Sequence, residues 1–490
     1  MMQQDSGRIL AELRLRSPVH GLARRHLGPL DVFAQSVSGA APAAAMSATP
    51  VIVAATAGPA TTWSFLVATV LALLIGTCIG RFTRRMAAAG SLYSLTAKGL
   101  GPGWAFGCGV ALLVGYGALA MAALAGAAIY LDTLIVRAGL GAPGSRPVLV
   151  TAVCALAILA VTLALVGVRL SARVVLLVEA ISISLMVLIF AVLLGSEGSS
   201  GVPPADAVPG PGLGGIAAGV LPALAAFIGF EAATALGVEA RRPFQTIPRA
   251  VQWTAGISGL LYLFAAYTQV VGFADVPGGL AGQTEPVPQL AAAHGRLWLS
   301  VLLDLGIAMS FFACALATGS ALVRVLFSMA RDGIAPAAFG ATHRRYRTPH
   351  VAIAVALPIA AGVPALLLAL GMPAGRVLSE LLTVATVGYL VAYLLVCLAA
   401  PLFLRRIGEL TTPPVVVTAV IVPILLVVLI AFVVSSLGRP LPIVAGLLVV
   451  VGAVWLVWLR LRRPDRLAGI GAYDETVAAD VFDERQVGIR

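Results

Sequence analysis

Apolar segments of about twenty residues recur along the whole chain, and they constrain its fold more than any other feature. Because about 20 apolar residues cross a bilayer as a helix, each segment predicts a membrane span. Hydrophobic residues make up 60% of the chain and charged residues 11%, whereas an average soluble chain carries about 25% charged residues. We therefore predict an all-α polytopic membrane protein with twelve transmembrane helices. The predicted spans are 30–56, 63–80, 104–131, 148–167, 174–195, 214–237, 250–272, 297–328, 350–370, 377–400, 415–436 and 441–460.

The positions of lysine and arginine predict the orientation of these spans. With the N-terminus in the cytosol, 26 of the 32 Lys and Arg residues lie in cytosolic segments and five lie in external loops. Because cytosolic loops of membrane proteins carry an excess of positive residues, both termini are predicted to be cytosolic and the protein to lie in the plasma membrane, surrounded by lipid. Residues 1–29 and 461–490 are then cytosolic tails, and 196–213 is an external loop. The net charge of +11 follows from this topology and requires no nucleic acid partner.

The scarcity of lysine, cysteine and histidine motifs excludes several kinds of chemistry. A Walker A loop needs glycine directly before its lysine, and the single lysine, Lys98, follows Ala97. The five cysteines have no CxxC spacing, and the five histidines form no HExxH pattern, so no metal-ligand pattern is present. We predict no cofactor, no metal site and no catalytic residue. This argues against an ATP-driven motor and against a membrane-embedded enzyme.

Two of the predicted spans, 1 and 6, are interrupted by small residues. The interruptions are Ser-Gly-Ala-Ala-Pro at 38–42 and Ala-Phe-Ile-Gly-Phe-Glu at 226–231. Interruptions at corresponding places in two five-span halves are typical of inverted-repeat transporters. Backbone groups freed at membrane depth need a cavity or a ligand, and an α-amino acid carries both charges that helix ends bind. The alternative is that proline and glycine only kink two packed helices.

Four stretches of the chain carry motifs of a known family. Residues 227–231, with Glu239, Pro243 and 247–250, read FIGFE…E…P…IPRA, which is the most specific of the four. The others are the break of span 1, an AGSLY segment at 89–93 followed by a glycine-rich start of span 3, and R…ARDGIAP at 324–336. Together they resemble the amino acid permease branch of the amino acid–polyamine–organocation superfamily.

The resemblance implies a five-plus-five inverted repeat, at 30–195 and 214–400, followed by two accessory helices at 401–460. Substrate would lie between the broken spans 1 and 6. Backbone N–H groups of Gly39 to Ala41 would bind a carboxylate, and carbonyl groups near Ser36 to Ser38 and at 226–228 would bind an amine. Phe227 or Phe230 would act as an aromatic gate over the site. The predicted substrate-binding residues are Ser38, Gly39, Ala40, Ala41, Phe227, Ile228, Gly229 and Phe230.

Two acidic residues inside the spans are candidates for coupling, because buried ionisable groups are costly in a membrane. Glu231 would begin the second half of span 6, either as a structural cap or as a proton acceptor that couples protonation to gating. Glu179 in span 5 is the second candidate, and the alternative is that it snorkels or pairs with Arg169 or Arg173. Proton-coupled relatives carry a lysine in this part of span 5, and residues 180–183 contain no basic residue.

Two arginines near the inner end of span 8 are candidates for gating. Arg324 and Arg331 would form an inner gate with Asp332 or Glu239. The alternative is that they only anchor the chain on the cytosolic side.

The residues and the resemblance together predict a secondary active transporter of amino acids that works by alternating access. A proton gradient or substrate exchange would supply the energy. One alternative is a polyamine or organic-cation carrier of the same superfamily. An alternative of another class, a membrane-embedded enzyme or receptor, is disfavoured because the motifs it needs are missing.

Overall fold

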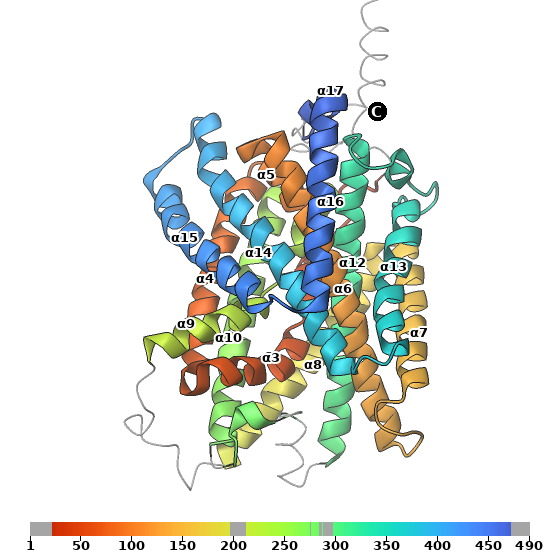
Figure 1. The fold of residues 1–490 in the computed structure, drawn as a ribbon, viewed down its shortest axis with the longest axis vertical. Coiled ribbons are helices and arrows are strands. Elements are labelled where there is room, and N and C mark those ends of the chain that lie inside the picture. Colours follow the sequence, from red (N-terminus) through yellow and green to blue (C-terminus); the bar gives the residue numbers. More distant parts are fainter. Residues whose placement is uncertain (1–21, 197–211, 275, 284–286, 288–296, 472–490) are drawn as a thin grey trace, which may run out of the picture.

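The structure is a computed structural model that describes residues 22–196, 212–274, 276–283, 287 and 297–471. Within these ranges the chain is helical, with no strand and one isolated bridge between Leu27 and Ala240, so the predicted all-α fold is confirmed (Figure 1). Most of the predicted tails and external loop, at 1–21, 197–211 and 472–490, lies outside the described residues. The α-helices are α2 (Pro29–Ala40), α3 (Pro42–Ala57), α4 (Thr61–Thr83), α5 (Leu92–Leu100), α6 (Pro102–Arg137), α7 (Arg146–Val166), α8 (Val168–Ser196), α9 (Leu213–Ala225), α10 (Pro243–Gly272), α12 (Leu297–Arg331), α13 (His350–Ala369), α14 (Ala374–Arg406), α15 (Thr412–Ser435), α16 (Pro440–Arg462) and α17 (Pro464–Ala468).

Nine helical segments in the described part of the chain are long and apolar enough to cross a membrane, by length and composition. One of them, Pro29–Thr83, contains three α-helices, α2, α3 and α4. The apolar helix α9 has only 13 residues. The number of twelve spans therefore stays a prediction, although helices occur in each of the twelve predicted segments. The sequence did not predict α5, a short helix in the segment before span 3 that packs against α6 and α14.

The long helices pack in pairs whose members are five predicted spans apart. Helix α4 packs against α10, α6 against α12, and α7 against α13, which pairs spans 2 and 7, 3 and 8, and 4 and 9. Helices α15 and α16 lie at the periphery, in contact with α14 (Figure 1). This pairing is what two interlocked five-helix repeats would produce. The domain boundaries and the repeat relation remain predictions.

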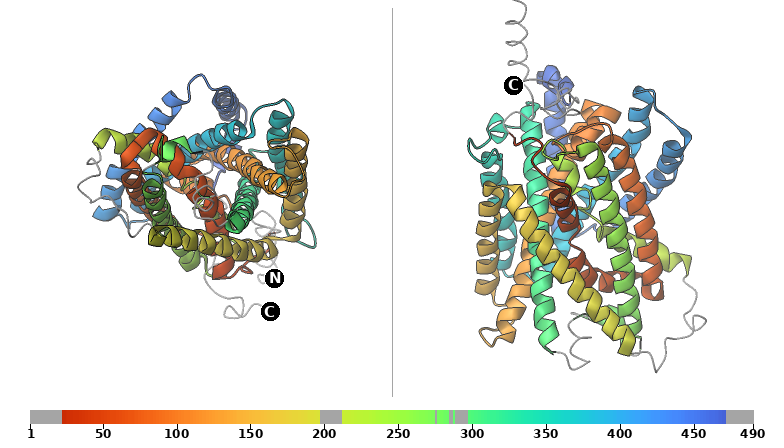
Figure 2. Two further views of the ribbon diagram at one scale, coloured as in Figure 1. Left: turned by 90° about the horizontal axis from the view of Figure 1, so that it is seen from below. Right: turned by 180° about the vertical axis from the view of Figure 1, so that it is seen from behind.

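The broken spans occupy the interior of the bundle. Nine of the twelve residues of α2 are buried, and views along and across the bundle place the α2–α3 segment among the longer helices (Figure 2). Helices α3 and α9 pack against each other and run crosswise to the long helices (Figure 1). The change of direction after α2 follows from the break at Ala41, which separates α2 from α3.

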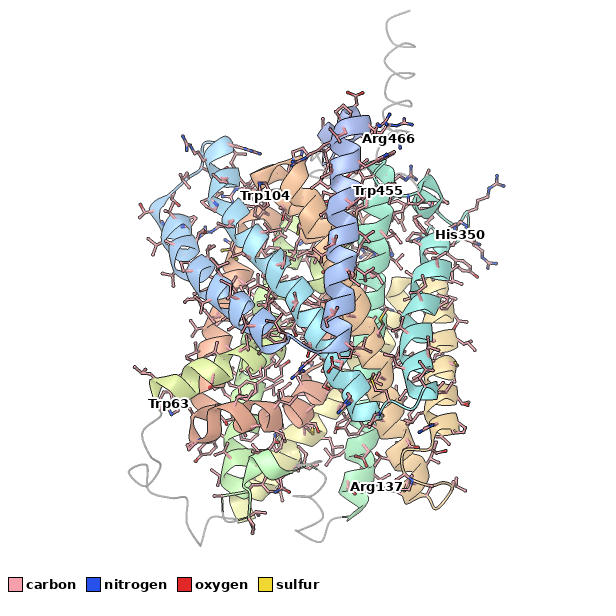
Figure 3. The ribbon with its side chains drawn as sticks, viewed as in Figure 1. Trp63, Trp104, Arg137, His350, Trp455 and Arg466 are labelled. Carbon is pink, nitrogen blue, oxygen red and sulfur yellow. The ribbon has the colours of Figure 1, made fainter. Side chains whose placement is uncertain are left out.

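The two ends of the bundle separate the loops that the charge distribution assigns to opposite sides. Trp104, His350 and Arg466, from the predicted cytosolic side, lie towards one end, and Arg137, from the predicted external side, lies at the other (Figure 3). Because positive residues alternate with the spans, this separation agrees with the predicted topology. Which end faces the cytosol stays a prediction.

Candidate functional site

The first break lies at Ala41, where the backbone turns into the left-handed region. Ala41 has φ 45° and ψ 62°, and its N–H donates to the carbonyl oxygens of Val37 (3.0 Å) and Ser38 (3.2 Å). Pro42 then opens α3, and it suits that position because a first helical residue needs no N–H. The predicted interruption of span 1 is confirmed.

The second break lies between α9 and a short 3₁₀ helix, η2 (Ala232–Leu236). Residues 226–231 form turns, and Gly229 has φ +91°, a conformation that glycine adopts at no steric cost. The predicted interruption of span 6 is confirmed. Its continuation differs from the prediction, because Glu231 precedes five residues of 3₁₀ helix and not the start of a second α-helix.

The two breaks touch each other through two glycines. A Cβ atom added to Gly39 would lie 2.3 Å from the carbonyl oxygen of Gly229, and one added to Gly229 would lie 2.3 Å from the carbonyl oxygen of Gly39. Ser36 on α2 donates a hydrogen bond to the carbonyl oxygen of Phe230. The tertiary structure therefore brings together the two runs that the sequence singled out, 190 residues apart in the chain.

Tyr262 on α10 bridges the two breaks. Its hydroxyl lies 3.0 Å from the carbonyl oxygen of Ala226 and 3.3 Å from that of Ala40, and its ring packs edge-on against Phe227 with centroids 5.0 Å apart. Both rings are fully buried. Sequence reasoning missed Tyr262, because a tyrosine in an apolar span carries no signal of the backbone that it contacts.

Glu231 is the centre of a buried polar cluster. The hydroxyl of Tyr116 donates to its Oε1 at 2.9 Å, and the hydroxyl of Tyr393 donates to its Oε2. Ser91 lies 2.9 Å from the Tyr116 hydroxyl and 2.7 Å from that of Thr234. The cluster joins α6, α14 and the segment before α5 to the second break, so Glu231 is linked to three elements outside its own.

Glu179 on α8 caps the first turn of α3. Its Oε1 accepts hydrogen bonds from the N–H of Ala43 (3.2 Å) and the hydroxyl of Ser310 (2.9 Å). The N–H of Ala44 donates to the Ser310 hydroxyl at 3.2 Å. Glu179 is fully buried, so it does not snorkel, and Arg173, one of its two suggested partners, pairs instead with Asp31 at 3.5 Å.

The backbone donors that the resemblance assigned to a substrate carboxylate are occupied in this conformation. Gly39 and Ala40 end α2, where an α-helix bonds its own N–H groups. The N–H of Ala41 donates to α2 carbonyl groups. Glu179 and Ser310 take the remaining donors at the start of α3. Ser38, by contrast, has a buried hydroxyl with no hydrogen-bond partner among the described residues.

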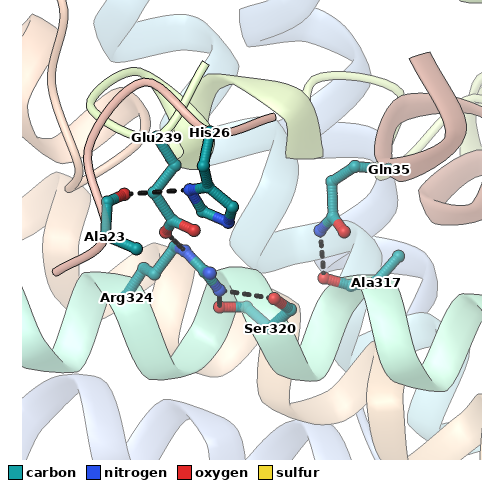
Figure 4. A network of polar contacts seen from close by, with 7 residues as sticks. All are labelled: Ala23, His26, Gln35, Glu239, Ala317, Ser320 and Arg324. Carbon is teal, nitrogen blue, oxygen red and sulfur yellow. Dashed lines mark hydrogen bonds and ion pairs between the residues drawn. The ribbon is translucent and has the colours of Figure 1, made fainter. Parts of the chain in front are cut away.

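A buried ion pair lies on the same helix as Ser310, further along α12. The Nε of Arg324 donates to Oε1 of Glu239 at 2.7 Å, and its Nη1 donates to the Ser320 carbonyl at 2.9 Å and to the Ser320 hydroxyl (Figure 4). Glu239 also accepts, through its carbonyl oxygen, the N–H of Leu27 at 3.0 Å. The pair therefore ties α12 to the segment after the second break and to the residues before α2.

The other candidates are placed as follows. Arg331 lies two turns beyond Arg324, with its guanidinium 5.3 Å from the centre of the Phe327 ring. Asp304 pairs with Arg137 at 3.0 Å. Gln35 on α2 donates to the carbonyl oxygen of Ala317 at 2.7 Å. None of these contacts involves the two breaks directly, and no group of metal-ligating side chains occurs among the described residues.

Comparison with known proteins gives one family match and several relatives. The sequence model of the amino acid permease family matches residues 31–454. The branched-chain amino acid permease BcaP of Bacillus subtilis is 26% identical over 315 residues, which cover 61% of this chain and 66% of that one. An uncharacterized transporter of Rhizobium meliloti is 31% identical, with 66% and 69% covered. Cationic amino acid transporter 4 of Mus musculus is 28% identical, with 80% and 61% covered.

The fold is also similar to that of a solved transporter. A crystal structure of the Eremococcus coleocola manganese transporter superposes with a TM-score of 0.51 at 14% sequence identity, and the match covers 90% of this chain and 95% of that one. At this identity the likeness concerns the fold alone. The alignments cover between about half and about two thirds of the length of these curated relatives.

Proposed function

Because the chain belongs to the amino acid permease family, we propose that it carries amino acids across the plasma membrane by alternating access, with both termini in the cytosol. The observation that carries this proposal is the contact between the two broken segments at Gly39 and Gly229. Irregular backbone at membrane depth is stable only where it is buried in protein or lines a cavity. Two such segments in mutual contact provide a site that opens when they separate and closes when they meet.

The proposed site lies between these segments. Ser38, Gly39, Ala40 and Ala41 would form one wall, and Phe227, Ile228, Gly229 and Phe230 would form the other. Phe230 lies 5.7 Å from the ring of Tyr393, and Phe227 contacts Tyr262, so both aromatic rings are held by residues of other helices. The buried rings and direct glycine contact describe a closed state, from which the walls must part to admit a solute.

The first prediction concerns flux. Purified protein in liposomes loaded with unlabelled amino acids should exchange external labelled leucine or arginine, saturably and without chemical change. We chose these two because relatives are named for branched-chain and cationic amino acids. Empty liposomes and liposomes with heat-denatured protein are the controls. If neither amino acid exchanges, nor any in a full panel, the transport proposal is wrong, and a chemically altered product would favour an enzyme.

The second prediction concerns coupling at Glu231, which we propose to be the proton acceptor. Glu231→Gln keeps the shape of the side chain and can still accept from Tyr116, but it cannot take up a proton. An inward proton gradient should stimulate uptake by the original protein and not by the variant, while exchange without a gradient stays within about twofold. Glu380→Gln, which changes another buried glutamate on α14, is the matched control. An unchanged response to pH would remove Glu231 from the coupling mechanism.

The arginines are proposed as parts of the inner gate, with different support for each. Arg324 is buried and paired with Glu239, and the pair joins three segments near the predicted cytosolic end. The support for Arg331 is its position on the same helix two turns beyond Arg324, where its guanidinium lies beside Phe327. A polyamine or organic-cation carrier remains the second candidate function, and one observation favours it, namely the buried carboxylate of Glu179 at the first break.

A further inference from the structure

We propose that Glu179 binds the ammonium group of the substrate, so that the amine, and not the carboxylate, is the part of the solute that the first break recognises. This inference rests on the proposed transport function and adds the substrate chemistry of the same site. It differs from the expectation that the start of α3 receives a carboxylate. The carboxylate found there belongs to the protein.

The backbone N–H groups in the first turn of α3 all have hydrogen-bond partners. An α-helix leaves its first four N–H groups without intrahelical partners. Pro42 has none, Ala43 donates to Glu179, and Ala44 donates to Ser310. Ala45 is satisfied by the carbonyl oxygen of Ala41 at 2.9 Å. A carboxylate from a solute would therefore have to displace Glu179, against whose negative charge it would also be repelled.

Two buried hydrogen-bond acceptors at this break, by contrast, lack a partner among the described residues. Oε2 of Glu179 is buried and has no hydrogen-bond partner in the part of the chain that the structure describes, and the same is true of the Ser38 hydroxyl. No salt bridge of Glu179 occurs in the ranges that the structure describes. A buried polar atom without a partner destabilises the structure, and an unpaired buried charge destabilises it more. An ammonium group has three donors and one positive charge, so it would supply the partners that the Glu179 carboxylate and the Ser38 hydroxyl lack.

The groups packed around Glu179 do not supply this charge. Ser310 and Cys314 on α12 are neutral donors, and the Cys314 thiol points to the carbonyl oxygen of Gly39 at 3.4 Å. Tyr262 on α10 directs its hydroxyl to the carbonyl groups of both breaks. The site therefore holds one carboxylate, several carbonyl oxygens and neutral hydroxyls. Such a set favours a primary amine or an amino acid bound through its amine.

The test compares solutes that differ only in their charged groups. For purified full-length protein in a sodium-free potassium buffer, binding is measured by calorimetry for two triplets. One is leucine, 3-methylbutylamine and 4-methylpentanoate, and the other is arginine, agmatine and 5-guanidinopentanoate. The comparison applies to whichever triplet contains an amino acid that the protein binds. In that triplet, the dissociation constant of the compound without a carboxylate should lie within about tenfold of that of the amino acid. The compound without the α-amine should bind at least a hundredfold more weakly, because it leaves the buried Glu179 carboxylate without its charged partner.

Variants then assign the effect to Glu179. Glu179→Gln retains an acceptor for Ala43 and Ser310, so the cap should persist, but amine affinity should fall about 30-fold or more. Glu179→Asp keeps the charge and should recover part of the affinity. Glu380→Gln should bind as the original protein does. Size-exclusion profiles and melting temperatures without solute show whether each variant is folded.

Three results would overturn the inference. They are unchanged amine binding by folded Glu179→Gln, binding of the carboxylates in preference to the amines, and no binding of any of the six solutes. Failure of the transport proposal is separate, because it is read from flux in liposomes. Amines that bind through Glu179 in a protein that moves no amino acid would leave this inference intact and exclude the proposed function.

Discussion

Gly229→Ala should abolish transport, with uptake reduced at least tenfold, and should destabilise the protein by about 3 kcal/mol or more. The added Cβ would lie 2.3 Å from the carbonyl oxygen of Gly39, and φ is +91°. Overpacking alone costs about 1–3 kcal/mol, and a left-handed conformation adds about 1–2 kcal/mol for any residue with a Cβ. The neighbour is backbone of the opposite break, so it cannot rotate away as a side chain would.

The measurement combines exchange of labelled solute in liposomes with the thermal unfolding midpoint in detergent. Gly362→Ala on α13 is the matched control, because a Cβ there would meet nothing within 4 Å, and alanine is favoured over glycine in a helix interior. Wild-type stability and exchange in Gly229→Ala would show that the two breaks do not need their direct contact.

Arg324→Met should destabilise the protein by about 3–5 kcal/mol, the usual cost of leaving one partner of a buried ion pair unpaired. Arg324 and Glu239 are each 4% exposed, and their Nε and Oε1 atoms are 2.7 Å apart. Methionine fills a similar volume but leaves the Glu239 carboxylate without its cation. Unfolding titrations at neutral pH measure the change in the free energy of unfolding.

Two further variants define what this pair does. The double variant Arg324→Met with Glu239→Leu should recover most of the lost stability, because apolar residues often replace a buried pair without cost. If the pair holds the inner gate, the same double variant should transport poorly. Arg85→Met is the control for charge removal in general. Its partner Glu409 is 54% exposed, so a change of at most about 1 kcal/mol is expected. A loss no larger than this in Arg324→Met would contradict the prediction.

Much of the site was predictable because its signals are local. Proline and small residues interrupt an apolar run in any context, so both breaks were predicted and both are present at Ala41 and at 226–231. The pairing of Arg324 with Glu239 was one of the arrangements expected from their motifs, and it is observed. The roles of the eight wall residues and of Glu231 in transport remain predictions.

The sequence by itself determined that the chain is a helical membrane protein of the permease type, because hydropathy, positive-residue placement and helix interruptions are properties of neighbouring residues. Only the tertiary structure decided which groups meet across the bundle. Tyr262 reaches two carbonyl groups from another helix, and Glu179 reaches α3 from 136 residues away. Helical periodicity says which residues share a face of a helix, but the rotation and tilt of each helix, which packing sets, decide what that face touches.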